Sequence, residues 1–225
     1  NVMQQGLLTS ALYGAEVTPI DKATIKIMQT EVLKSEGLTG PGLRNQWKWA
    51  VLGPTKDPEY KIRSAVVIRL AREVWHAADT MTQGKGPQHD VLKPRELSTL
   101  FHTISGAQET GNTTGSVLVD WIVDSLNHFG IKVYGPIKWS ISNECFDATV
   151  TTKHNWHLAL TRVWESRLLT AINSDRTDSR FEAVDISLIT RYARRMNSRT
   201  RKLYAQVLSD AVYTYQRAKK LSLKT

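Results

Sequence analysis

Apolar residues recur every three or four positions after Asp57-Pro58, and this is the clearest pattern in the chain. An α-helix brings positions with this spacing onto one face, so the pattern predicts a long core helix around which the other elements pack. The aspartate is expected at the N-cap and the proline at the first helical position. The stripe consists of Ile62, Val66, Leu70, Val74, Ala77 and Met81. The basic residues expected on the other face are Lys61, Arg63, Arg69 and Arg72.

The same spacing predicts further helices over residues 18–36, 43–52, 94–104, 116–129 and 153–172. Thr18-Pro19, Pro94 and either Thr114 or Ser116 are expected at N-termini, and Gly37 and Gly130 at C-terminal ends. The residues expected to face inward include Ile27, Met28, Val32, Val117, Leu118, Trp121 and Trp164.

Between residues 131 and 151 the pattern changes to alternation with β-branched and aromatic residues, interrupted by Gly135-Pro136 and Asn143-Glu144. This predicts two or three short antiparallel strands. The expected fold is therefore mainly α-helical with a small antiparallel β element. The Gly- and Thr-rich stretch from Ser105 to Gly115 is the candidate boundary between two lobes. These would be an N-terminal helical lobe over residues 1–105 and a second lobe over residues 116–225 with the β element and the basic C-terminal helices.

Composition narrows the class of protein. The 225 residues are 41% hydrophobic, which is ordinary for a soluble globular protein, and no run approaches the ~20 apolar residues of a membrane span. The first residues show no signal peptide, and a start at Asn1 suggests a fragment or a processed product. Cys145 is the only cysteine, which excludes an intramolecular disulfide and a cysteine-rich zinc site. We expect an intracellular protein, in the nucleus or the cytoplasm.

The net charge of +9 is unevenly distributed. Residues 1–152 contain 15 basic and 15 acidic residues, whereas residues 153–225 contain 15 basic and 6 acidic residues. The whole excess therefore lies in the C-terminal third, which is expected to attract phosphate or an acidic surface.

The C-terminal stretch from about Asp185 to Lys220 is predicted to form two consecutive helices. Asp185 is expected to cap the first, and Asn197 or Ser198 the second. The apolar stripe of the first helix comprises Ile186, Ile189, Tyr192 and Met196, and that of the second begins with Leu203, Val207 and Leu208.

Residues 191–202, which we call the basic joint, connect the two stripes. Six of these twelve residues are basic and none is acidic. Like charges at this density repel one another, and a nucleic-acid backbone would offset that cost. The alternative is a solvated basic face with partners elsewhere in the fold. The predicted nucleic-acid-binding residues are Arg191, Arg194, Arg195, Arg199, Arg201 and Lys202, followed by Tyr213, Arg217, Lys219 and Lys220 as outer contacts.

Aromatic residues beside basic ones are typical of surfaces that hold single-stranded nucleic acid. Trp47-Lys48-Trp49, Lys138-Trp139 and Arg191-Tyr192 have this composition, as does the stretch from Tyr213 to Arg217. Of these we expect Tyr213 and Trp49 to be exposed, because tryptophans at helical spacing are usually core residues.

Other candidates for chemistry are weaker. Asp120 and Asp124 share a helix face but lack a third carboxylate for a metal. Cys145, His154 and His157 could suggest a metal site or a thiol–imidazole pair, but no fourth ligand or orienting residue accompanies them. No Gly-Lys-Ser/Thr loop follows a strand. We therefore expect no catalytic residue, no metal and no cofactor in this segment, with an enzyme based on Cys145 as a remote alternative.

The order of several short motifs carries a resemblance to a known family. They are ALYGAEV at residues 11–17, VLGP at 51–54 with Asp57-Pro58, HFG at 128–130, GPIKW at 135–139 and VLSDAVYT at 207–214. Together they resemble the segment downstream of the palm in LINE-like, non-LTR retroelement polyproteins. The resemblance implies a thumb and connection region that holds template–primer or element RNA while the palm performs the chemistry.

Three features of such polyproteins are missing from this sequence. It contains no Tyr-x-Asp-Asp palm motif, no Cys/His knuckle and no endonuclease signature. The expected function is thus RNA or template–primer binding without catalysis. The alternative is a structural or accessory subunit that docks through its basic helices on RNA or on an acidic protein surface.

Overall fold

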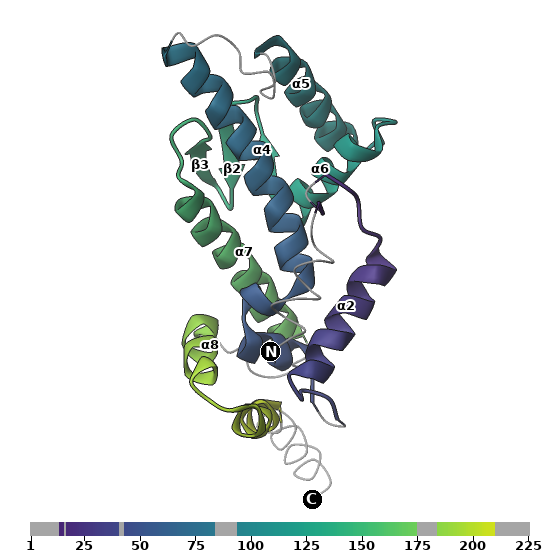
Figure 1. Cartoon of the computed structure of the whole chain (residues 1–225), viewed down its shortest axis with the longest axis vertical. Helices are drawn as coiled ribbons and strands as arrows, with labels where there is room; N and C mark the ends of the chain where they lie inside the picture. The colour runs from purple at the N-terminus through teal and green to yellow at the C-terminus, as the bar shows by residue number, and fades with distance from the viewer. Residues whose placement is uncertain (1–13, 16, 41–42, 84–93, 175–183, 210–225) are drawn as a thin grey trace, which may run out of the picture. The chain divides into compact units, whose positions relative to one another are not determined.

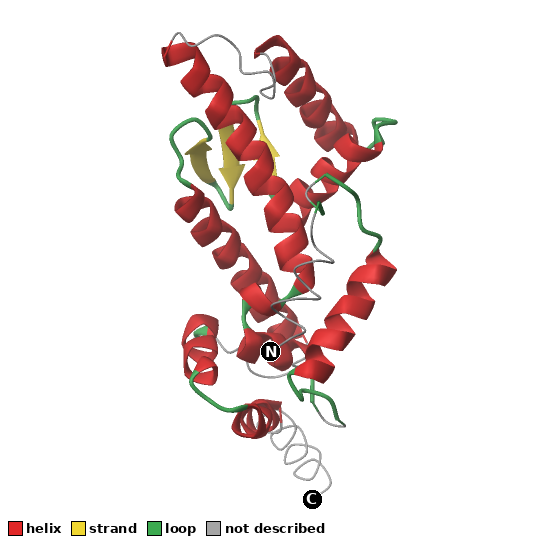
Figure 2. Cartoon of the chain, viewed as in Figure 1, coloured by secondary structure: helices red, strands yellow, loops and turns green. Residues whose placement is uncertain are grey.

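The computed structural model describes residues 14–15, 17–40, 43–83, 94–174 and 184–209. The chain is mostly helical, with one small three-stranded antiparallel sheet, as the sequence predicts (Figures 1 and 2). In the described part of the chain, no helix is both long and apolar enough to cross a membrane.

The chain divides into two compact units, and the division falls inside two helices, α4 and α7. Unit 1 contains Asn1–Ser10, Lys22–Glu59 and Trp164–Thr225, and unit 2 contains Ala11–Asp21 and Tyr60–Val163. The predicted boundary near residues 105–115 is a different division and stays a prediction. The α5 helix runs through that stretch as far as Thr110, so the helix is longer than the sequence analysis predicts.

The elements of unit 1 are mainly short helices. They are α2 (Lys22–Ser35), α3 (Asn45–Leu52), the 3-10 turn η2 (Pro54–Lys56), the end of α7 (Lys153–Ser174), α8 (Ile186–Arg194) and the helical residues 198–209. Unit 2 combines most of α4 with the sheet. Its elements are α4 (Pro58–Gln83), α5 (Pro94–Thr110), α6 (Val117–His128), β1 (Ile131–Val133), β2 (Lys138–Ile141), β3 (Glu144–Asp147) and the first part of α7.

Most predicted helix ends are confirmed. The Ser116 hydroxyl accepts a hydrogen bond from the Val119 amide at the start of α6, and the Asp185 carboxylate caps α8 in the same way. Gly37 follows α2 with a φ of 70°, in the left-handed region that favours glycine at helix ends. The prediction for α2 is wrong at its start, because the helix begins at Lys22 and not at Thr18-Pro19.

Asp57 holds the start of α4 against two other helices of unit 1. Its carboxylate accepts hydrogen bonds from Gln29 of α2, from the indole of Trp164 of α7 and from the backbone amide of Glu59, each at 3.0 Å. Burial raises the pKa of Asp57, although these three hydrogen bonds act in the opposite direction. The residue predicted as a simple cap is therefore also a tertiary contact.

The sheet of unit 2 has the order β1-β2-β3 with both pairs antiparallel. A two-residue turn joins β2 to β3, and both its residues, Ser142 and Asn143, have positive φ values as such tight hairpins require. The free edge of β1 is covered by Gln108 of α5, whose side chain donates to the Ile131 carbonyl and accepts from the Val133 amide. The side-chain amide of Gln108 thus bonds the edge of β1 as a fourth strand would.

Aromatic rings fill the core of unit 2. Trp139 of β2 is fully buried, and its ring lies 5.0 Å from that of Trp156 in α7 and 5.7 Å from that of Phe101 in α5. The sheet is therefore fixed to α5 and α7 through one side chain. Because Trp139 is buried, it is excluded as a base-stacking residue next to Lys138.

Several expected orientations are wrong. Arg63 was predicted on the outer face of α4, but it is 2% exposed, pairs with Asp124 at 2.8 Å and lies over the Trp121 ring. The opposite error concerns Ile27, Val117 and Leu118, which were predicted to face inward and are exposed. Tyr192, Leu203 and Val207, which were placed on the apolar stripes of the C-terminal helices, are exposed as well.

Replacing Trp139 by alanine should lower the free energy of unfolding of the protein by about 3–5 kcal/mol, because a large buried ring is removed. The matched control is Trp75→Ala in the same unit, where the side chain is 44% exposed and its ring contacts His76. That change should cost less than about 1 kcal/mol. Chemical denaturation followed by circular dichroism measures both, and equal losses would contradict the described core.

Candidate nucleic-acid interface

The basic joint lies entirely in unit 1, where α8 ends and the next helix begins (Figure 1). Arg195 is the C-cap of α8, and Asn197 caps the following helix by accepting a hydrogen bond from the Thr200 amide at 2.9 Å. The chain therefore turns within three residues, and the prediction of Asn197 as a cap is confirmed. Both helix ends carry cationic side chains at this turn.

The α8 helix is fixed by its packing on α3. Thr190 donates a hydrogen bond from its hydroxyl to the Ala50 carbonyl at 2.7 Å, and Ile186 and Ala193 are buried on the same face. A Cβ atom on Gly53 would lie only 2.4 Å from the Thr190 methyl group, so the helix approaches the backbone closely at this glycine. The position of the basic joint thus depends on the contact of Thr190 with Ala50 and Gly53.

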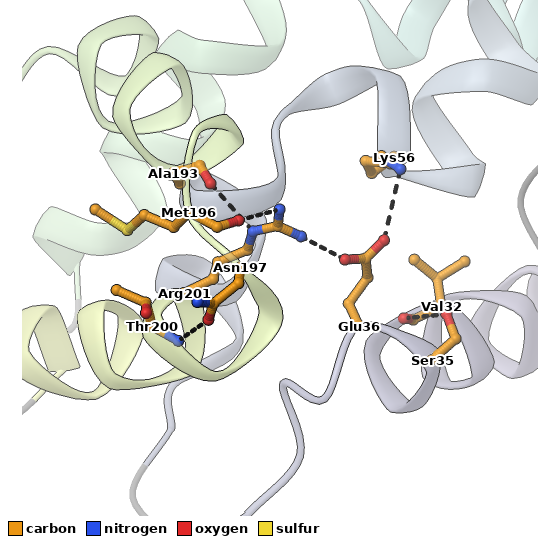
Figure 3. A network of polar contacts seen from close by, with 9 residues as sticks. All are labelled: Val32, Ser35, Glu36, Lys56, Ala193, Met196, Asn197, Thr200 and Arg201. Carbon is orange, nitrogen blue, oxygen red and sulfur yellow. Dashed lines mark hydrogen bonds and ion pairs between the residues drawn. The ribbon is translucent and has the colours of Figure 1, made fainter. Parts of the chain in front are cut away.

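Arg201 is the one residue of the joint with several intramolecular partners in the described chain. Its guanidinium donates to the Ala193 carbonyl at 3.2 Å and to the Met196 carbonyl at 3.1 Å, both at the end of α8 (Figure 3). It also forms an ion pair with Glu36, which follows α2. The side chain of Arg201 is 17% exposed, so this placement favours a structural role over phosphate binding.

Glu36 is a buried acid between two cations. Its side chain is 7% exposed, and its second oxygen lies 3.5 Å from the Lys56 ammonium group, as Figure 3 shows. Sequence reasoning missed this residue, although a signal was present. An acid just past the end of a helix is disfavoured by the helix dipole, which indicates that a cation from elsewhere must compensate it.

The other five basic residues of the joint point to solvent or are half-buried. Arg191, Arg194, Arg195 and Arg199 are exposed, and Lys202 is partly exposed. Within the part of the chain that the structure describes, none of the five forms an ion pair. The structure therefore separates one compensated arginine from five cations that form no ion pair in the described chain, of which Arg191 still interacts electrostatically with the Asp185 carboxylate.

The dipoles of the two helices act on these charges in opposite ways. Arg191 and Arg194 lie in the last turn of α8, where the dipole is negative and a cation is stabilised. Arg199 and Lys202 lie in the first turns of the next helix, where the dipole is positive and a cation is disfavoured. An anion bound at this turn would offset the unfavourable interaction of Arg199 and Lys202 with the helix dipole.

Tyrosines lie among the cations. Tyr192 is 56% exposed on α8, and Tyr204 of the next helix is half-buried. Burial raises the pKa of Tyr204, and Tyr192 adds a smaller contribution in the same direction. Trp49, expected to be exposed, is half-buried on α3.

Four predicted contacts lie outside the described residues. They are Tyr213, Arg217, Lys219 and Lys220.

The residues considered for metal or nucleophilic chemistry have other surroundings. Asp120 accepts two hydrogen bonds from Thr114, and Asp124 pairs with Arg63. Cys145 is exposed. Burial lowers the pKa of His157, and the nearby charges of Lys153 and His154 lower it further. Among the described residues, no group of three or more potential ligands lies close enough to hold a metal ion.

No protein-family model matches the chain, and neither a curated protein nor a solved structure matches it.

The contact between Gly53 and Thr190 can be tested by a rescue. Gly53→Ala should lower the free energy of unfolding by about 2–5 kcal/mol, because it combines a strained positive φ with a clash against the Thr190 methyl group. Adding Thr190→Ser removes that methyl group, keeps the hydroxyl and should restore part of the loss. Thermal or chemical denaturation of the single and double variants measures this coupling.

Gly37→Ala is the control for a positive φ without a clash, because no atom lies within 4 Å of a Cβ added at Gly37, whereas Gly53 also has a ψ of 169° that adds strain of its own. It should cost about 1–2 kcal/mol, and Thr190→Ser should not change that cost. A Gly53→Ala variant no less stable than Gly37→Ala would show that α8 does not approach Gly53 so closely.

Proposed function

We propose that this chain is a nucleic-acid-binding segment without catalysis of its own and that the basic joint contacts the phosphate backbone. One observation carries the proposal: five cations of the joint have no ion-pair partner within the described chain, although a buried carboxylate nearby compensates the sixth. A polyanion would supply the missing charge. Contacts of this kind give affinity without sequence specificity.

The finer form of the proposal follows the resemblance to LINE-like retroelement polyproteins. In that form the chain is a thumb-like segment that holds element RNA or template–primer for a palm elsewhere in the polyprotein. The predicted outer contacts, Tyr213, Arg217, Lys219 and Lys220, would extend the surface along the nucleic acid.

A second candidate function is that of a structural or accessory subunit. The observation that favours it is a pair of exposed apolar residues one helical turn apart, Leu203 and Val207, which are 56% and 64% exposed. Such residues beside cations suit an acidic protein partner. Stable co-purification with another chain that survives nuclease treatment would support this candidate over the first.

Charge reversal of the joint tests the first proposal. The variant Arg194→Glu, Arg195→Glu, Arg199→Glu should lose measurable binding to fluorescently labelled RNA or DNA in low salt, with the helix content unchanged by circular dichroism. For the unmodified protein the logarithm of affinity should fall with the logarithm of salt concentration, with a slope of roughly −3.5 on a single strand and roughly −4.5 on duplex DNA for five phosphate contacts.

The matched control changes the net charge equally at exposed cations outside the joint, with Lys22→Glu, Lys26→Glu and Lys132→Glu. This variant should lose much less affinity, because only the long-range field is altered. Unchanged binding by the joint variant would contradict the proposal, and an equal loss in the control would show that net charge alone, not the joint, determines binding.

A further inference from the structure

We propose that the basic joint selects single-stranded nucleic acid and that the Tyr192 ring is the surface on which a base stacks. This inference rests on the proposed function and adds the class of ligand. The observation behind it is an exposed aromatic ring near the end of α8, in the same short stretch as Arg191, Arg194 and Arg195, which form no ion pair in the described chain.

The packing of α8 accounts for the position of the ring. The helix is held on α3 by Ile186, Thr190 and Ala193, which are all buried. Tyr192 lies on another face and is 56% exposed. Within the described chain it makes no ring contact with another aromatic residue. A large ring left in solvent is available for a ligand.

The neighbours of Tyr192 supply charge and a second apolar surface. Arg195 lies three positions further along, so its side chain emerges next to the ring on the same face. Leu188 lies one turn before Tyr192 and is 45% exposed. Tyr204, on the next helix, is half-buried. The exposed surface thus alternates apolar groups and cations over a short distance.

This combination distinguishes single strands from duplexes. A base in a duplex is covered on both faces by its neighbours, whereas an unpaired base offers its face to an aromatic side chain. Cations alone would bind both forms through the phosphates. An exposed ring among the cations adds affinity only for the unpaired form.

The test compares Tyr192→Ala with wild type on a labelled single-stranded RNA of roughly 12 nucleotides and on the corresponding duplex. The variant should bind the single strand about 5- to 100-fold more weakly and the duplex within about twofold of wild type. The salt dependence should stay the same, because no charge is removed. Tyr192→Phe keeps the ring and should bind the single strand like wild type.

Leu188→Ala is the control for loss of exposed apolar surface on the same helix, and it should reduce single-strand affinity much less than Tyr192→Ala. A second measurement uses a strand of the same length with abasic sites. Wild type and Tyr192→Ala should bind that strand equally, because no base is present to stack.

Each other outcome overturns the inference. If Tyr192→Ala binds the single strand like wild type while the charge-reversed joint does not bind, the joint contacts phosphates but Tyr192 does not stack. An equal loss on single strand and duplex would give Tyr192 a structural role. If the charge-reversed joint also binds normally, the proposed function itself fails.

Discussion

The ion pair between Arg201 and Glu36 is the interaction on which the arrangement of unit 1 depends. It joins the C-terminal helices to the end of α2, and the same guanidinium bonds two carbonyl groups at the end of α8. Both side chains are more than four-fifths buried, so removal of one partner would leave a charge in a poorly hydrated place, at a typical cost of about 3–5 kcal/mol. Arg201 therefore connects the helix after the joint to α2 and to the end of α8, while the packing of α8 on α3 sets the position of Arg191 and Arg194.

This constraint also explains how a dense basic segment can belong to a stable fold. Arg201 is compensated internally, α8 presents the negative end of its dipole to Arg191 and Arg194, and exposed cations are screened by water and salt. Only Arg199 and Lys202, in the first turns of the following helix, are stabilised neither by an internal ion pair nor by the helix dipole. The repulsion inferred from sequence thus reduces to a few residues, and these are the ones for which an anionic ligand would have the largest effect.

The sequence was sufficient to predict the helices, the β element and most helix ends, because these depend on local chemistry. The capping side chains of Ser116, Asp185 and Asn197 act on amides two or three residues away, and the Gly37 conformation is a property of its own backbone. The direction in which a residue faces depends on what packs against it. Arg63 is buried because Trp121 and Asp124 come from another helix, and no spacing within α4 contains that information.

In the basic joint, too, the role of a residue depends on contacts that the local sequence does not contain. Arg199 and Arg201 are two positions apart in one basic run, and composition gives them the same expected role. In the structure one is exposed and the other is held by an acid 165 residues earlier in the chain. Tyr192 was placed on the apolar stripe of α8 because it continues an apolar spacing, yet Thr190 and Ala193 are the residues buried where α8 packs on α3. The Tyr192 ring lies on another face, so the surface offered to a ligand depends on which face of α8 packs on α3.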